Sequence, residues 1–222
     1  MMNNNRSTHV IALAALLVAV VGLSIGFAAF TNTLTIKSSA DVTPDQNTFN
    51  VDFSSNGTEQ AADPVVATLT GTGVTAENAT IDNSAAGAAV IQNLHAHFTA
   101  PGQKATYSFY AHNLGEYEAF LKSITFQNID GESSSKKCTA GSGATANLVT
   151  AACEKITLSV KVGNETATTS SVATITNHSL AASAFEPVTV VIEYSADGNV
   201  RADGPFDVAF GDVVLTYNST DA

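Results

Sequence analysis

The stretch Ile156-Thr157-Leu158-Ser159-Val160-Lys161-Val162 alternates apolar and polar side chains without a break. Successive side chains of a β-strand point to opposite faces, so this pattern predicts a strand with one buried and one solvated face. The same alternation recurs on both sides of it, in the segments 49–53, 94–98, 107–111, 124–126, 188–194, 206–210 and 213–217. Turn signals separate these segments: Asn56-Gly57, Pro101-Gly102, Asp130-Gly131, Asp197-Gly198 and Asp203-Gly204-Pro205. We therefore expect an all-β fold, a two-sheet sandwich of the jelly-roll kind.

Helical patterns are scarce after the first 37 residues. Short helical turns are expected only at Leu114–Phe120 and near Ala144–Ala152. Two less regular stretches, Gly71–Gly87 and Gly131–Thr150, are expected to be loops or short edge strands. A chain of 222 residues suits a single folded domain of ordinary size, here residues 30–222.

The N-terminal region has the order of an export signal. Arg6 precedes an uncharged apolar run from Val10 to Phe30, and the chain then turns polar. The run predicts a hydrophobic helix and is long enough to cross a bilayer, which takes about 20 residues. A cleaved signal peptide and a membrane anchor over residues 1–29 therefore both remain open. Small residues favour cleavage after Ala28 or Ala29, and we expect an extracellular or cell-surface protein exported through the cytoplasmic membrane.

The charge of the chain argues against nucleic acid as a partner. Its formal net charge is -11, and its only basic cluster is the pair Lys136-Lys137. Binding a phosphate backbone needs a basic footprint, which this sequence lacks. The dispersed acidic residues indicate a soluble surface more than an acidic active site or a calcium site.

Cys138 and Cys153 are the only cysteines. An even count in an exported chain, with a small-residue loop between the two, predicts a structural disulfide. A metal site would need further ligands at close spacing, and a catalytic cysteine would need a positioned histidine. Neither alternative fits the sequence as well.

Two segments carry a resemblance to a known family. The junction Gly26-Phe27-Ala28-Ala29-Phe30-Thr31-Asn32 places a glycine and a short aromatic and alanine run before a Phe-Thr-Asn step. The segment Ala100–Leu121 contains Pro101-Gly102, an alternating strand, Asn113-Leu114-Gly115 and an Ala-Phe-Leu element. Both resemble the TasA/camelysin family of exported surface and biofilm-matrix fibre proteins. The last third of the chain does not follow that family's pattern.

The resemblance implies a jelly-roll-like sandwich that polymerises by donating an N-terminal strand to the next copy. In residues 30–36 the apolar side chains Phe30, Leu34 and Ile36 share one face, as a donor strand requires. The expected partners are thus copies of the chain itself, joined by sheet-edge pairing, and the membrane during export. An ordinary first strand of its own domain is the alternative for this segment.

Catalytic motifs are not visible, and we expect neither an enzyme nor a cofactor. His95 and His97 lie two apart on one face of a strand, which makes them weak candidates for metal ligands, but no third ligand can be named. Camelysin-type proteins are sometimes classed as metallopeptidases. This chain has no His-Glu-x-x-His motif and no Gly-x-Ser-x-Gly elbow.

Five Asn-x-Ser/Thr sequons follow the leader, at Asn56, Asn78, Asn164, Asn177 and Asn218. Such sites accept glycans where the host has the machinery, and several are expected by chance in a chain rich in these residues. They are interpreted here as a sign of exposed loops.

Three functions follow in order of preference. The first is a structural subunit of an extracellular filament, pilus or biofilm matrix that assembles by N-terminal donor-strand exchange. The second is a monomeric, membrane-anchored binding or adhesion module. The third is a secreted metallopeptidase.

Overall fold

The computed structural model describes residues 49–58, 64–85, 88–169, 175–196 and 200–220. The expectations for the hydrophobic helix, for the cleavage residues Ala28 and Ala29, and for the donor strand with Phe30, Leu34 and Ile36 lie outside these residues. The described residues belong to one compact unit, Pro44–Ala222.

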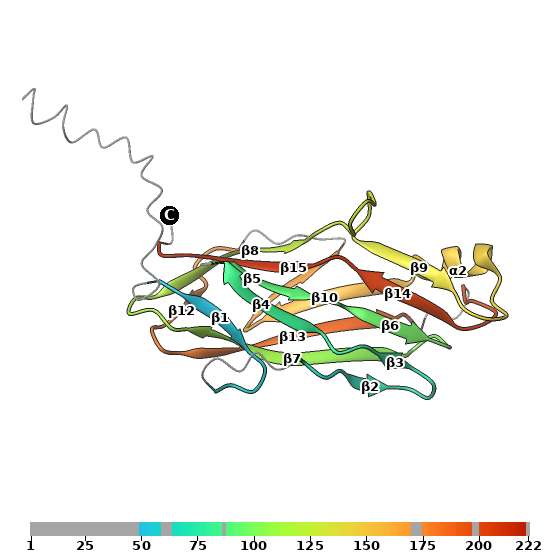
Figure 1. Cartoon of the computed structure of the whole chain (residues 1–222), viewed down its shortest axis with the longest axis horizontal. Coiled ribbons are helices and arrows are strands. Elements are labelled where there is room, and N and C mark those ends of the chain that lie inside the picture. Colours follow the sequence, from blue (N-terminus) through green and yellow to red (C-terminus); the bar gives the residue numbers. More distant parts are fainter. Residues whose placement is uncertain (1–48, 59–63, 86–87, 170–174, 197–199, 221–222) are drawn as a thin grey trace, which may run out of the picture. The chain divides into compact units, whose positions relative to one another are not determined.

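The unit is built from antiparallel sheets in two layers (Figure 1). The first layer is one sheet in the order β1-β7-β13-β10-β11, with β2 also paired to β7. Its strands are β1 (Val51–Ser54), β2 (Thr68–Thr70), β7 (Lys104–Asn113), β10 (Ile156–Val162), β11 (Glu165–Thr168) and β13 (Phe185–Tyr194).

The second layer consists of two sheets placed end to end. One has the order β12-β8-β15-β5-β4 and the other β3-β6-β14-β9. Their strands are β3 (Thr75–Ala76), β4 (Thr80–Ala85), β5 (Ala88–Gln92), β6 (His95–Phe98), β8 (Ala119–Phe126), β9 (Lys136–Ala140), β12 (Ser179–Leu180), β14 (Phe206–Phe210) and β15 (Val213–Asn218).

The two sheets of the second layer are halves of one surface. Each strand of one half leads into its counterpart in the other: β3 into β4, β5 into β6, β8 into β9 and β14 into β15. Backbone hydrogen bonds cross the break, from the Phe210 N–H to the Leu94 carbonyl (2.9 Å) and from the Gln127 N–H to the Asp212 carbonyl (2.8 Å). Gly211 is required at this break, because a Cβ there would lie 2.1 Å from the Gln127 carbonyl oxygen. Together the layers form an antiparallel β-sandwich.

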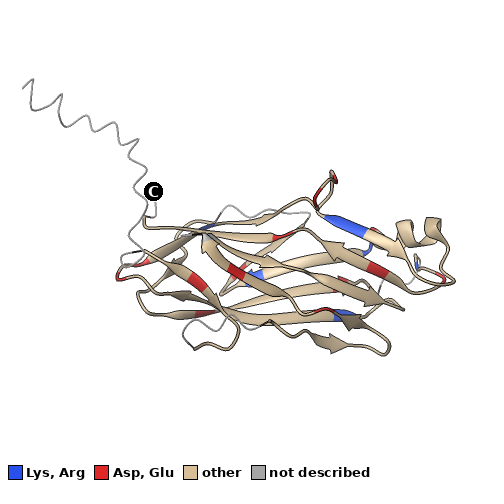
Figure 2. Ribbon diagram, in the orientation of Figure 1, with Lys and Arg blue, Asp and Glu red and all other residues tan. Residues whose placement is uncertain are grey.

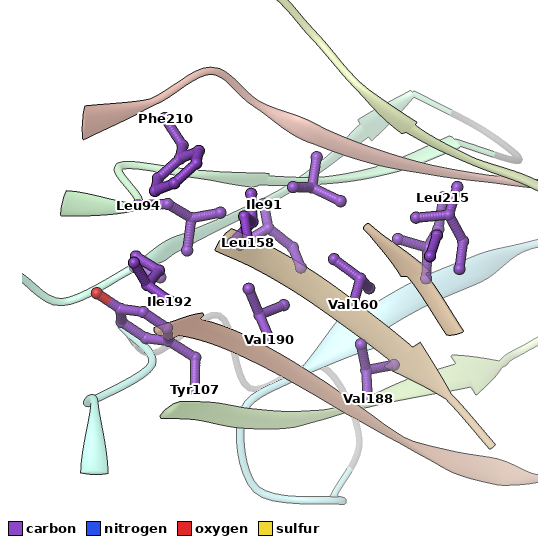
Figure 3. Packing of buried hydrophobic residues seen from close by; sticks show 14 of the residues in the cluster. Ile91, Leu94, Tyr107, Leu158, Val160, Val188, Val190, Ile192, Phe210 and Leu215 are labelled. Atoms are coloured by element: carbon purple, nitrogen blue, oxygen red, sulfur yellow. The ribbon is translucent and has the colours of Figure 1, made fainter. Parts of the chain in front are cut away.

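The core lies between the layers, where the alternating apolar side chains meet (Figure 3). In β10 the residues Ile156, Leu158, Val160 and Val162 are buried, while Thr157 and Lys161 are exposed. The predicted alternation is therefore confirmed in this strand. It is confirmed also in the strands β6, β7, β13, β14 and β15, whose burial patterns alternate in the same way.

Helical structure is limited to α2 (Ala146–Cys153) within the described residues. This confirms the helical turn predicted near Ala144–Ala152. The helix predicted at Leu114–Phe120 is wrong: Leu114–Glu118 form a bend and β8 begins at Ala119. Asn113 explains the bend, because its buried side chain accepts the Gly115 N–H and donates to the Tyr117 and Leu180 carbonyls. No helix in the described part of the chain is long and apolar enough to span a membrane.

One long side of the sandwich is closed by neutral hydrogen bonds. The Asn83 amide of β4 accepts the Phe53 N–H (2.8 Å) and donates to the Phe53 carbonyl (3.0 Å), as a neighbouring strand would. Val65 and Ala79 exchange backbone hydrogen bonds on the same side. The Tyr107 hydroxyl donates to the Glu77 carbonyl. These contacts join the edges of the two layers.

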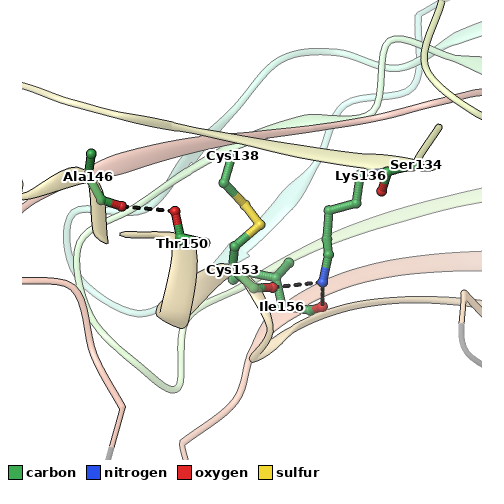
Figure 4. The surroundings of a disulfide bond; sticks show 7 residues. All are labelled: Ser134, Lys136, Cys138, Ala146, Thr150, Cys153 and Ile156. Atoms are coloured by element: carbon green, nitrogen blue, oxygen red, sulfur yellow. Dashed lines mark hydrogen bonds between the residues drawn. A yellow bond between two sulfur atoms is a disulfide. The ribbon is translucent and has the colours of Figure 1, made fainter. Parts of the chain in front are cut away.

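The opposite side is closed by covalent and charged contacts. Cys138 of β9 and Cys153 of α2 form the predicted disulfide (Figure 4). Beside it, Lys136 Nζ donates to the Cys153 carbonyl (2.7 Å) and the Ile156 carbonyl (3.0 Å). Partial burial lowers the pKa of Lys136. The disulfide and this lysine thus join β9 of the second layer to α2 and the start of β10.

We predict that the double substitution Cys138→Ala and Cys153→Ala lowers the free energy of unfolding by about 3 kcal/mol, because the bridge closes a short loop in the unfolded chain. Chemical denaturation with and without reductant measures this, since reductant should affect only the wild type. Mass spectrometry that finds both cysteines as free thiols in freshly isolated protein would contradict the disulfide.

We predict opposite outcomes for two buried tyrosines. Tyr107→Phe removes a hydroxyl that donates to the Glu77 carbonyl (3.0 Å), and should cost about 1–2 kcal/mol. Tyr217→Phe should be neutral or stabilising, because its buried hydroxyl has no hydrogen-bond partner among the described residues. Burial raises the pKa of Tyr107 to about 12 and also raises that of Tyr217. Thermal unfolding of both variants makes the comparison, and an equal loss of stability would contradict it.

Candidate functional site

The outer edge of β8 is paired over only part of its length. β12 pairs with its first residues, Ser179 with Phe120 and Leu180 with Ala119. The Leu121 N–H then donates to the His178 carbonyl (2.9 Å). From residue 123 to residue 126 no strand of the described residues pairs with β8 on the side away from β15. We call residues 123–126 the open edge.

The direction of the backbone groups along the open edge follows from its two ends. The Leu121 N–H points toward β12, and the Gln127 N–H points toward the β15 side, where it donates to the Asp212 carbonyl. Backbone groups of a strand alternate in direction, so the Phe126 and Ile124 N–H groups point away from β15. These are the donors that an added strand would use.

A β-bulge lies at the start of the open edge. Thr216 of β15 pairs with Ser123, whereas Tyr217 pairs with Leu121, so Lys122 is an extra residue in β8. Bulges and lysines discourage pairing of exposed edges. The regular part of the open edge is therefore short, from Ser123 to Phe126, with Ile124 buried in the core and Phe126 packed against it.

Charged contacts border the open edge near β12. His178 Nε2 lies 2.8 Å from Glu186 Oε2, and His178 Nδ1 lies 3.8 Å from Glu165 Oε1. The His178 side chain is only 10% exposed, so these carboxylates hold it between the layers. Gly163 has a positive φ of 53° here, a conformation that disfavours a side chain, and a Cβ would meet the Glu186 carboxylate. The contact joins β11 and β13 of the first layer to the segment that precedes β12.

The structure places His95 and His97 on the outer face of β6, as the alternation predicts, with Ala96 and Phe98 buried. Each imidazole is held by a carboxylate from a neighbouring segment. His95 Nδ1 lies 2.9 Å from Glu77 Oε1, and His97 Nδ1 lies 2.9 Å from Asp207 Oδ1.

The two histidines lie in a shallow hollow of about 460 Å³, which Gly73, Thr75 and Ala76 also line. The hydrogen bond from His95, followed by that from Asn93, lowers the pKa of Glu77. Glu77 and Asp207 were not identified from the sequence. They come from segments distant in the chain, and only the pairing of β3 and β14 with β6 brings them together.

Among the described residues, no group of three or more His, Cys, Asp or Glu side chains is arranged to hold a metal ion. His112 lies on β7 between β1 and β13, in the other layer from β6. The histidines and carboxylates instead satisfy one another.

The surface carries no basic patch in the described part of the chain. The ribbon in Figure 2 marks acidic residues on many strands. Two lysines, Lys136 and Lys137, begin β9. Lys137 Nζ lies 2.8 Å from Glu132, and Lys104 Nζ lies 3.0 Å from Glu193. Surface ion pairs of this kind contribute little to stability. They also leave few unpaired lysine side chains that could bind the phosphates of a nucleic acid.

We predict that excess Zn²⁺ leaves the melting temperature of the protein unchanged. A ligand that binds only the native state raises its stability. Among the described residues, however, no three His, Cys, Asp or Glu side chains are arranged to hold a metal ion, and the carboxylates of Glu77 and Asp207 already pair with His95 and His97. Differential scanning fluorimetry with and without Zn²⁺ makes the measurement. A Zn²⁺-dependent rise that His97→Ala abolishes would contradict the prediction.

The chain matches no protein-family model, no curated protein and no solved structure. The resemblance of two segments to the TasA/camelysin family therefore rests on those residues alone. This resemblance supports the function proposed below, but it does not place the chain in that family.

Proposed function

We propose that this protein is a non-catalytic structural subunit of an extracellular filament, pilus or biofilm matrix, and that copies join by donor-strand exchange. The observation that carries the proposal is the open edge of β8. An antiparallel sheet with an unpaired edge accepts a further strand through main-chain hydrogen bonds. In this proposal the donor is residues 30–36 of a second copy.

The donor segment and the open edge have matching chemistry. Phe30, Leu34 and Ile36 form one apolar face. On the acceptor, Ile124 and Phe126 pack into the core from the open edge, so a strand added there would lay its apolar face beside apolar side chains. Side-chain packing then supplies the register, and backbone pairing supplies the affinity.

The placement of the chain ends supports head-to-tail joining. Val51 of β1 pairs with Asn113, and Asn218 of β15 pairs with Phe120, so the first and last described strands meet the 113–120 bend at one end of the sandwich. Helix α2 lies at the other end, beside β9 and β14 (Figure 1). The first described strand, β1, therefore begins at the end opposite α2, and a donor segment from another copy would be joined to its own domain at that end.

Three finer features belong to the same proposal. The two layers follow a jelly-roll topology, residues 1–29 act as a cleaved signal peptide, and removal of this peptide after Ala28 or Ala29 frees the donor. Assembly then begins only after export, because the donor segment stays attached to the membrane until the signal peptide is cleaved. The second candidate, a monomeric anchored module, retains the whole N-terminal segment.

We predict that the mature protein, residues 30–222, forms filaments and that residues 37–222 fold but stay monomeric. The shorter chain keeps every described strand and lacks only the donor. Electron microscopy and light scattering measure assembly, and circular dichroism checks folding. Polymerisation of the shorter chain like the longer one would contradict donor exchange, and an intact Met1 on the surface-exposed protein would favour the anchored module.

We predict that Phe126→Pro blocks assembly while Phe126→Ala permits it. Both variants lose the same ring from the margin of the core. Only proline removes the N–H that points to the open edge, and it leaves the ladder to β15 intact because that N–H does not serve it. Filament yield at equal protein concentration compares the two. If Phe126→Pro assembled as well as Phe126→Ala, β8 would not be the acceptor.

A further inference from the structure

The sequon at Asn56 lies in a turn that holds its amide in a defined position. The Asn56 Oδ1 accepts hydrogen bonds from the Thr58 N–H (3.0 Å) and the Thr58 hydroxyl (2.5 Å). The Ser54 hydroxyl donates to the Thr58 carbonyl (2.6 Å) and closes the turn. The oxygen side of the Asn56 amide is thus occupied by the residue two positions on, and the Asn56 side chain is exposed.

The asparagines of the other sequons are exposed as well, and Asn78, Asn164 and Asn177 lie outside the strands, as interpreted. For Asn218 the interpretation as a loop is wrong, because this residue is the last of β15. The backbones that follow Asn78 and Asn164 differ from that of Asn56. The residues after Asn78 pair with Val65 and β5, and those after Asn164 form β11, which pairs with β10. An oligosaccharyltransferase must draw the acceptor asparagine and the residues after it away from the protein surface. A sequon whose residues belong to a paired strand therefore requires local unfolding before the glycan can be transferred. The described residues of the Asn56 turn, 55–58, lie outside any strand.

Aromatic side chains lie beside this turn on the outer face of the first layer. Tyr110 of β7 pairs with Ser54 of β1, which lies two residues before Asn56. A Cβ added at Gly57 would lie 3.2 Å from the ring of Tyr110. Tyr110 and Phe185 are 36% and 37% exposed, with ring centroids 6.4 Å apart. Exposed neighbouring aromatic rings on a sheet face indicate a contact surface.

We propose that Asn56 is the acceptor of an N-linked glycan in the folded protein, and that the first sugar packs on Tyr110. In the transfer, Asn56 Nδ2 attacks C1 of a sugar carried on a polyprenyl phosphate-type lipid. The N–C1 bond forms, the C1–O bond breaks, the lipid phosphate leaves with the electron pair, and the amide nitrogen loses one proton to the transferase. A pyranose ring has an apolar face of C–H groups, which suits the negative face of an aromatic ring.

In vitro transfer tests the acceptor. The folded full chain and the denatured chain are incubated with an oligosaccharyltransferase of Asn-x-Ser/Thr specificity and a lipid-linked glycan, and glycopeptides are quantified by mass spectrometry. We expect Asn56 to be modified in the folded chain, with Asn78 and Asn164 on the order of tenfold slower because their strands must open. Thr58→Ser should retain the modification and Thr58→Ala should lose it. Modification of Asn56 only after denaturation would overturn the proposal.

The position of the sugar has its own readout. Removal of the glycan should lower the melting temperature by about 2 °C, because the exposed ring of Tyr110 loses its cover. In the Tyr110→Ala variant, which retains the sequon, the same removal should leave the melting temperature unchanged. An equal fall in both proteins would show that the sugar does not pack on Tyr110.

Discussion

Burial of one sheet face against another is the interaction on which the rest of this structure depends. The inner side chains of β10 and β13, such as Val160 and Val190, are fully buried opposite Ile91 and Leu215 of the second layer. Apolar burial is the dominant favourable term in folding and is worth roughly 25 cal/mol per Å². Because it needs two layers at a fixed spacing, it also determines where the edges lie and which polar groups must find partners.

The strand edges along the two long sides of the sandwich are joined by different kinds of contact. On one side the neutral amide of Asn83 stands in for a strand and satisfies both backbone groups of Phe53. On the other side a disulfide, Lys136 and the pair of His178 with Glu186 join the layers. Between these charged contacts the edge of β8 carries a bulge and a short regular stretch. A bulge and a short regular stretch both limit the pairing that an exposed strand edge would otherwise permit.

Chemistry on the outer faces is independent of the core. The long strands, such as β10 and β13, bury one face, so their opposite face can vary with less loss of packing. One outer face places His95 and His97 among carboxylates, and another places Tyr110 and Phe185 beside the Asn56 turn. The first set is internally satisfied, while the aromatic side chains remain partly exposed.

The sequence by itself determined the regularly alternating strands, the disulfide and the outward direction of His95 and His97, but not short strands such as β2, β11 and β12. Strict alternation, as in residues 156–162, depends only on the period of the strand, so it was readable without a fold. The helical turn predicted at Leu114–Phe120 was wrong. The buried side chain of Asn113 holds this segment in a bend through hydrogen bonds to the Tyr117 and Leu180 carbonyls, and no local pattern reveals these contacts.

Only the tertiary structure decided which strands become neighbours. The partners of His95 and His97, the open edge of β8 and the approach of Tyr110 to the Asn56 turn all follow from pairings between distant segments. Local propensity carries no information about such pairings, because they are fixed by the global burial of both layers at once.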